Sequence, residues 1–184
     1  MFPSRNTTNL QQTNFYAWVS SSKFGLSEDE AKNVWQKQNI IANGCALPFV
    51  FLIGKFSDKI SPKILVPFTL IFQIVVMSAY MFCEKPNGWY AYFLSVFQAA
   101  SGFMIIVSMQ GYAVKRVPKM IRGITMAVII SLSAIGGVVY LQLSKLFYES
   151  NVNMVFGLIA AFDGVVLLVI LVSIFTGYYG DPAR

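Results

Sequence analysis

The stretch Gly54-Lys55-Phe56-Ser57-Asp58-Lys59-Ile60-Ser61-Pro62-Lys63 stands between two long apolar runs of the chain. An apolar run of about 20 residues is long enough to cross the hydrocarbon core of a bilayer. The charged stretch is therefore predicted to be a short loop that joins two transmembrane helices.

The composition supports a membrane protein. Of the 184 residues, 56% are hydrophobic and only 12% are charged, and the mean hydropathy is +0.60. The net charge of +6 does not indicate nucleic-acid binding, because the positive charges gather in short segments between apolar runs. The chain has no histidine, and Cys45 and Cys83 are isolated. We therefore predict no cofactor, no metal site and no enzyme activity.

The chain is predicted to have three parts. Residues 1–26 form a polar and aromatic N-terminal segment, in which Phe15, Tyr16 and Trp18 are predicted anchors at the membrane interface. Residues 27–178 form a five-helix transmembrane bundle, and residues 179–184 form a short C-terminal tail. The predicted spans are approximately 34–54, 64–82, 89–114, 123–147 and 154–178.

Local signals set the ends of these helices. Ser27-Glu28-Asp29-Glu30 has the pattern of a capping box, which starts a helix. Pro48 lies inside the first predicted span and is expected to kink it. Residues 84–88 combine proline, asparagine and glycine, and they predict a tight turn between the second and third spans.

The basic residues predict the orientation of the bundle. Two of the predicted loops contain most of the positive charge, and we expect both to face the cytoplasm, or the matrix of a mitochondrion. With five spans, the N-terminus then lies on the opposite side of the membrane. The residues in these loops are Lys55, Lys59 and Lys63, followed by Lys115, Arg116, Lys119 and Arg122.

The pattern of the opening stretch resembles the signature loop of the major facilitator superfamily of transporters, which joins the second and third helices of a six-helix half. Gly54 matches the first glycine of that loop, Asp58 its acid, Lys59 the adjacent base and Lys63 the last base. Ser61 and Pro62 replace a glycine and a base, respectively. The resemblance implies that the glycine allows close helix contact and that the charged residues bond to neighbouring helices and take part in gating.

A second stretch supports the same resemblance. Pro118-Lys119-Met120-Ile121-Arg122-Gly123 is similar to the Pro-x-x-x-Arg-Gly sequence that enters the fifth helix of a half in this family. Together the two motifs align residues from about 33 to 177 with helices two to six. The implied fold is an all-α membrane protein, a truncated half bundle of about five transmembrane helices without the first helix. Which half it matches stays open, and the short tail after the last span favours the C-terminal half.

Polar residues inside the predicted spans are candidate functional residues. Asp163 lies about 13 Å along the last span, because a helix rises about 1.5 Å per residue. A carboxylate near mid-membrane is costly and is by default a candidate site. It would act as a proton-coupling acid, or it would be protonated or hydrogen-bonded to a neighbouring helix or a partner subunit, and the second interpretation is favoured. Gln98, Gln110 and Gln142, together with Gln73, would line a solute path or bond helix to helix.

Small residues at four-residue spacing also appear in the last two spans, and they are typical of closely packed membrane helices. In the fourth span they are Gly123, Ala127 and Ser131 and the pair Ser133 and Gly137; in the fifth they are the pairs Gly157 and Ala161, and Ala160 and Gly164.

Two functions remain open from the sequence. In this family the solute path lies between two six-helix halves. The two motifs align this chain with only five helices of one half, so the favoured hypothesis is a non-transporting accessory subunit derived from a transporter. Its partners would be lipids and other integral membrane subunits that cover the open face of the bundle. A large energy-converting complex of the mitochondrial inner membrane is the expected host. The alternative is one part of a split secondary transporter for a small solute.

Overall fold

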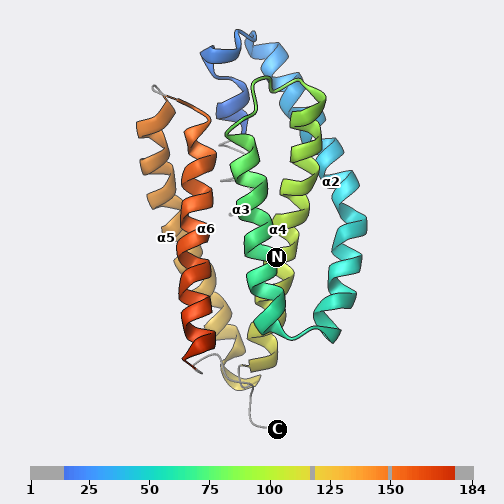
Figure 1. Cartoon of the computed structure of the whole chain (residues 1–184), viewed down its shortest axis with the longest axis vertical. Coiled ribbons are helices and arrows are strands. Elements are labelled where there is room, and N and C mark those ends of the chain that lie inside the picture. Colours follow the sequence, from blue (N-terminus) through green and yellow to red (C-terminus); the bar gives the residue numbers. More distant parts are fainter. Residues whose placement is uncertain (1–14, 117–118, 149–150, 177–184) are drawn as a thin grey trace.

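The computed structural model describes residues 15–116, 119–148 and 151–176. Within these ranges the chain is helical and contains no strand. Two single turns of 3-10 helix, η1 and η2, lie beside five long α-helices that run roughly along the same axis (Figure 1). The elements are η1 (Ser22–Phe24), α2 (Glu28–Lys59), α3 (Pro62–Tyr80), α4 (Trp89–Arg116), η2 (Lys119–Ile121), α5 (Arg122–Tyr148) and α6 (Met154–Phe175). The predicted all-α half bundle of about five long helices is confirmed.

Helix α3 is the centre of the bundle. It packs against α4 on one side and against α6 on the other, while α2 lies along α4 and α5 lies beside α6 (Figure 1). Four helices in the described part of the chain are long and apolar enough to cross a membrane, namely α2, α3, α4 and α6. Helix α5 contains a shorter apolar segment, Val138–Phe147, which is apolar but below the length of the other four. The chain is therefore an integral membrane protein.

The start of α2 and the turn before α4 form as the local sequence predicts. The Ser27 backbone N–H donates to Glu30 Oε2 at 2.9 Å, and the Glu30 N–H donates to Ser27 Oγ at 3.4 Å, which completes the capping box. In the turn, the Gly88 N–H donates to the Lys85 carbonyl at 3.2 Å. Gln38 of α2 also donates to the Pro86 carbonyl at 2.5 Å, so the turn is attached to α2.

The charged stretch between α2 and α3 is not a loop over most of its length, and that prediction was wrong. Helix α2 continues through Lys59, where the sequence analysis ended its span near Gly54. The Ile60 N–H still donates to the Phe56 carbonyl at 2.8 Å, and Ile60 then becomes extended. Ser61 caps α3 and Pro62 occupies its first turn, so the connection is a single sharp corner.

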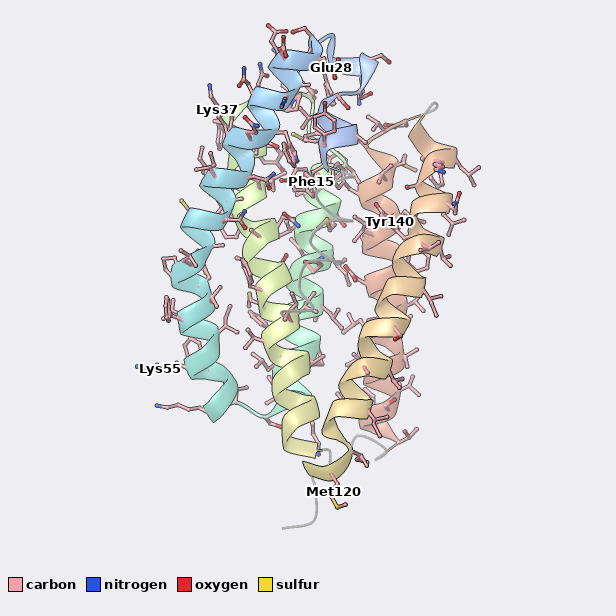
Figure 2. All side chains as sticks on the ribbon, turned by 180° about the vertical axis from the view of Figure 1, so that it is seen from behind. Phe15, Glu28, Lys37, Lys55, Met120 and Tyr140 are labelled. Carbon is pink, nitrogen blue, oxygen red and sulfur yellow. The ribbon has the colours of Figure 1, made fainter. Side chains whose placement is uncertain are left out.

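Phe15 and Trp18 of the N-terminal segment are core residues, which corrects their interpretation as interfacial anchors, whereas Tyr16 is half-buried and packs edge-on against Trp35 of α2. Trp18 is 0% exposed and Phe15 is 8% exposed. Both pack edge-on against Tyr80 at the end of α3, and both contact Phe156 in the first turn of α6. Three parts of the chain therefore meet at the end of the bundle where Phe15 lies in Figure 2, and they form one aromatic cluster. Its members are Phe15, Trp18, Tyr80 and Phe156.

Asn153 holds this aromatic cluster together. Its Oδ1 accepts a hydrogen bond from Trp18 Nε1 at 2.9 Å, and its Nδ2 donates to the carbonyls of Met81 and Cys83, each at 3.1 Å. Asn153 is only 6% exposed. One amide side chain thus joins the N-terminal segment, the α3–α4 turn and the start of α6, and its bonds to Trp18 and Cys83 are buried.

The small residues contribute to packing at fewer positions than their spacing predicts. A Cβ on Gly157 would lie 2.9 Å from the Met81 sulfur, so this glycine does allow a close contact between α6 and the end of α3. A Cβ on Gly123, Gly136 or Gly164 would meet nothing within 4 Å. Close helix packing at small residues is therefore limited, among these four glycines, to the first turn of α6.

Candidate polar site within the bundle

Three polar side chains meet where α3, α4 and α6 pack together. Gln73 of α3 is 3% exposed and Ser101 of α4 is 0% exposed. Ser101 Oγ donates to Gln73 Oε1, and the Gln73 side chain also hydrogen-bonds the carboxyl group of Asp163 on α6. The interpretation of Asp163 as a residue that bonds to a neighbouring helix is thereby supported by its contact with Gln73.

The geometry follows from helix periodicity. Gln73 lies seven residues before Tyr80 on α3, and Asp163 lies seven residues after Phe156 on α6. Residues seven apart lie on the same face of a helix, about 10.5 Å apart along it. The face that buries the aromatic cluster at the end of the bundle therefore brings Gln73 and Asp163 together about two turns further inside.

The carboxyl group of Asp163 is only partly satisfied. Its Oδ2 atom is buried and has no hydrogen-bond partner in the described part of the chain. Trp35 Nε1 and the Tyr80 hydroxyl are also buried without a partner, but these are neutral groups near the aromatic cluster. Among the described residues, Asp163 is therefore an acidic side chain inside the membrane-spanning part of the bundle with one carboxyl oxygen that has no hydrogen-bond partner.

The other buried polar side chains of α3 and α4 bond to their own helices. Thr69 donates to the Val66 carbonyl at 2.9 Å, Ser95 to the Tyr92 carbonyl at 2.7 Å and Ser108 to the Met104 carbonyl at 2.6 Å. Such bonds return the hydroxyl to the backbone and leave the group inert. Ser101 Oγ also lies 2.8 Å from the Gln98 carbonyl of its own helix, so its single proton is shared between that carbonyl and Gln73 Oε1. The Ser101–Gln73–Asp163 set differs because it links three helices.

Among the predicted glutamines, Gln73 contacts Asp163. Gln98 is half-buried on α4, and its backbone carbonyl accepts a hydrogen bond from Ser101 at 2.8 Å. Gln142 is exposed on α5, where its Oε1 accepts from Lys145 Nζ at 3.4 Å. The side chain of Gln110 lies outside the described part of the structure. Ser101 was not predicted, because a serine in an apolar helix usually bonds to its own backbone and gives no sequence signal of its own.

The motif residues lie at the end of the bundle opposite the aromatic cluster, as Lys55 and Met120 in Figure 2 show. Lys59 is exposed and Lys63 is half-buried. A Cβ on Gly54 would meet nothing within 4 Å, so the close helix contact that the resemblance implies at this glycine is not made by the described residues.

The remaining motif residues are only partly described. Asp58 lies in the last turn of α2 and Arg122 begins α5, but their side chains are outside the described part of the structure, as is all of Pro118. Gly123 follows Arg122 in α5 and is exposed. Their predicted part in gating therefore stays a prediction.

The site contains no obvious reaction chemistry. No group of three or more metal-binding side chains occurs among the described residues. An acid, an amide and a hydroxyl can exchange protons or bind a polar group, but they include no activated nucleophile. The arrangement defines a polar contact between the helices of an integral membrane bundle.

The comparison with known proteins identifies the family. The family model of the Major Facilitator Superfamily matches residues 15–184. The chain therefore belongs to the major facilitator superfamily and is a transporter-related protein. The match includes residues 15–24, which the structure places in the aromatic cluster and its connection to α2. No curated protein and no solved structure matches the chain.

Proposed function

We propose that this chain is a structural, non-transporting subunit of a larger membrane complex, derived from a transporter of its family. The interior of the bundle carries this proposal. The buried hydroxyls of Thr69, Ser95 and Ser108 bond to their own helices, and Ser101, Gln73 and Asp163 bond between helices. These bonds hold the helices together, as expected of a scaffold, and they engage these polar groups except for Asp163 Oδ2, which has no partner among the described residues.

The outside of the bundle supports a partnered, membrane-embedded role. Large apolar side chains are exposed on all five long helices, for example Phe51 at 79% on α2 and Phe175 at 86% on α6. Only 17% of the most apolar stretch of α2 and 11% of that of α6 are buried in the bundle, whereas 50% of that of α3 is buried. The outer helices therefore offer broad surfaces to lipid or to other transmembrane subunits.

Transport would require a second bundle. Members of this family move a solute between two halves that rock against each other around a site near mid-membrane. The described helices form one bundle of this kind. A split secondary transporter for a small solute is the second candidate, and the unpartnered Oδ2 of Asp163 favours it because a free carboxylate oxygen can take a proton or a solute donor.

The location and orientation belong to the same proposal. The lysines around the α2–α3 corner and the basic segment before α5 would face the matrix or the cytoplasm, with the aromatic end on the opposite side. We place the chain in the mitochondrial inner membrane, where large complexes contain many accessory transmembrane subunits. Accessibility of Lys55 to a membrane-impermeant amine reagent, from each side of sealed vesicles, tests the orientation.

The proposed function is tested by purification of the tagged chain from its native membrane in a mild detergent. Native sizing and mass spectrometry of the purified material then identify what accompanies the chain. A constant set of several unrelated membrane subunits is the expected result. A single companion with the remaining helices of this family would instead establish the split transporter. A lone or self-associated chain would contradict both.

A further inference from the structure

We propose that the outward face of α2, near the end of this helix at Lys59, binds an anionic phospholipid. The phosphate group of the lipid lies on Lys55 and Lys59. One acyl chain lies deeper in the membrane, along Leu47 and Phe51. The inference does not depend on the proposed function, because an accessory subunit and a transporter would both contact lipid on this face.

Four exposed residues of α2 form a row at four-residue spacing. Leu47 is 55% and Phe51 is 79% exposed. Lys55 and Lys59 continue the row toward the end of the helix, and both are exposed. Residues four apart lie on one side of a helix, and each step advances about 6 Å along it. The row is therefore apolar in its first half and cationic in its second half, which is the order of groups along a phospholipid.

The row faces away from the rest of the bundle. The buried residues of the same stretch, Ala42, Ala46 and Ile53, lie on the other side of α2, and α2 packs mainly against α4. Figure 2 shows Lys55 on the outer side of the bundle. The row is therefore open to the surroundings of the described chain along its whole length.

The change from apolar to cationic residues coincides with the edge of the membrane. The apolar span of α2 ends at Phe56, so Lys55 lies in its last turn and Lys59 lies one turn beyond Lys55. Lysines at such positions direct their ammonium groups to the level of the lipid headgroups. Their side chains are neighbours on the helix surface, so both can donate to one phosphate group. Phe51 lies about 6 Å deeper than Lys55, at the level of the acyl chains.

The charge at this end of the bundle favours an anion. The stretch 54–63 contains three lysines and one aspartate, and residues 115–122 at the same end add four basic residues and no acid (Figure 2). Among the described residues, no acidic side chain pairs with Lys55 or Lys59. At its other end α2 has three acidic residues in its first turn. An anionic headgroup therefore complements the end near Lys59 and does not complement the opposite end.

A transmembrane helix of another protein is the competing occupant of the row. Such a helix fits the apolar half, but it serves the lysines only if it has an acidic residue at the membrane edge. Free phosphate fits the lysines, but it has no group for Leu47 and Phe51. An anionic phospholipid complements both halves of the row with one molecule.

The first test measures which lipid stays bound to the full chain, purified in mild detergent with any subunits that accompany it. The protein is equilibrated with equal amounts of phosphatidylglycerol and phosphatidylcholine, and mass spectrometry quantifies the bound lipids. Lys55→Gln and Lys59→Gln should each lower the preference for phosphatidylglycerol by about fivefold, the effect of one lysine near a headgroup. Glutamine keeps the helix propensity of lysine, so these exposed substitutions should not unfold α2.

Two matched controls separate the row from the overall charge. Lys37→Gln removes an exposed lysine from the other end of α2, and Lys119→Gln removes one from η2 at the same end of the bundle. Both should leave the preference within about twofold of wild type, because exposed charges outside the row are screened. A loss with Lys119→Gln as large as that with Lys55→Gln would refute the site, since charge alone would then attract the lipid.

The second test identifies what lies on the apolar half. A photoreactive benzoylphenylalanine replaces Phe51, and mass spectrometry identifies the crosslinked product in membranes that contain phosphatidylglycerol. The expected product is this phospholipid, with a lower yield when Lys55→Gln and Lys59→Gln are combined. Crosslinks to another protein in place of lipid would overturn the inference. Soluble glycerol phosphate, which has a phosphate group and no acyl chain, should not displace the lipid. Its success at low concentration would reduce the row to a phosphate site.

Discussion

Replacement of Asn153 should loosen the aromatic end of the bundle more than any other single polar change. Asn153→Ala removes three hydrogen bonds, those with Trp18 Nε1, the Met81 carbonyl and the Cys83 carbonyl. It also leaves three buried groups without partners, since Trp18 is 0% and Asn153 6% exposed. At a net value of about 1 kcal/mol for each bond, the expected loss is about 3 kcal/mol of unfolding free energy.

Asn153→Asp separates the hydrogen-bond argument from simple packing. The substitution preserves size but replaces the donating Nδ2 by an oxygen that faces two carbonyls at 3.1 Å. The carboxylate is therefore expected to be as damaging as alanine at neutral pH, although it fills the same volume. Protonation at acidic pH supplies one donor, so part of the loss should be recovered there relative to wild type.

The assay is unfolding of the purified protein in detergent, followed by tryptophan fluorescence. A double-mutant cycle of Asn153→Ala with Trp18→Phe isolates the side-chain bond between them, with an expected coupling of about 1 kcal/mol. A loss below about 0.5 kcal/mol for both Asn153 variants would refute the reasoning, because it would mean that water satisfies these groups in the native protein.

Three further measurements test other parts of the structure. Ser27→Ala should lower stability by about 1 kcal/mol, since it removes the N-cap of α2, and hydrogen exchange of the first turn should rise with it. Burial raises the pKa of the Cys83 thiol, so a water-soluble maleimide should leave Cys83 unmodified in the folded protein even near pH 9. Cys45 is exposed and should react with an apolar maleimide. Rapid modification of Cys83 in a Cys45→Ser variant would contradict this expectation. Gly157→Ala should lower stability by less than about 1 kcal/mol, because its Cβ would lie 2.9 Å from the sulfur of Met81, the flexible end of a side chain that can move aside. Gly136→Ala, with nothing within 4 Å, should be neutral or stabilising by up to about 1 kcal/mol in the same unfolding assay.

The sequence predicts best the features that depend on neighbouring residues. The capping box of α2 and the turn before α4 use bonds between residues three apart, and both form as expected. The end of α2 was missed for a related reason. Charged residues near a helix end were interpreted as a loop, but Lys59 is favourable in the last turn of a helix, where it faces the negative end of the dipole. Only the pair Ser61-Pro62 marks the actual boundary.

Features that depend on long-range packing could not be predicted in the same way. Trp18 is a residue type that often anchors helices at the membrane interface. Nothing near it in the sequence indicates its bond to Asn153, which lies 135 residues away. The polar site shows the same limit. Asp163 was predicted because a charge inside a membrane is costly. Ser101 resembles any other serine in an apolar helix. Its bond to Gln73 could be predicted only with the knowledge that α3 lies between α4 and α6.

The two ends of the bundle differ in how much of their stability the chain supplies itself. At the aromatic end, Phe15, Trp18, Tyr80 and Phe156 pack together, and Asn153 satisfies backbone and side-chain groups from separate segments. Beyond Asp163 toward the basic end, α6 contains no buried residue within its described length, although its apolar character continues to Phe175. A membrane helix gains little from mutual burial of apolar surface in lipid, so its association depends on close packing and polar bonds. Both are concentrated at and before Asp163, so the described helices hold the second half of α6 less tightly than its first half.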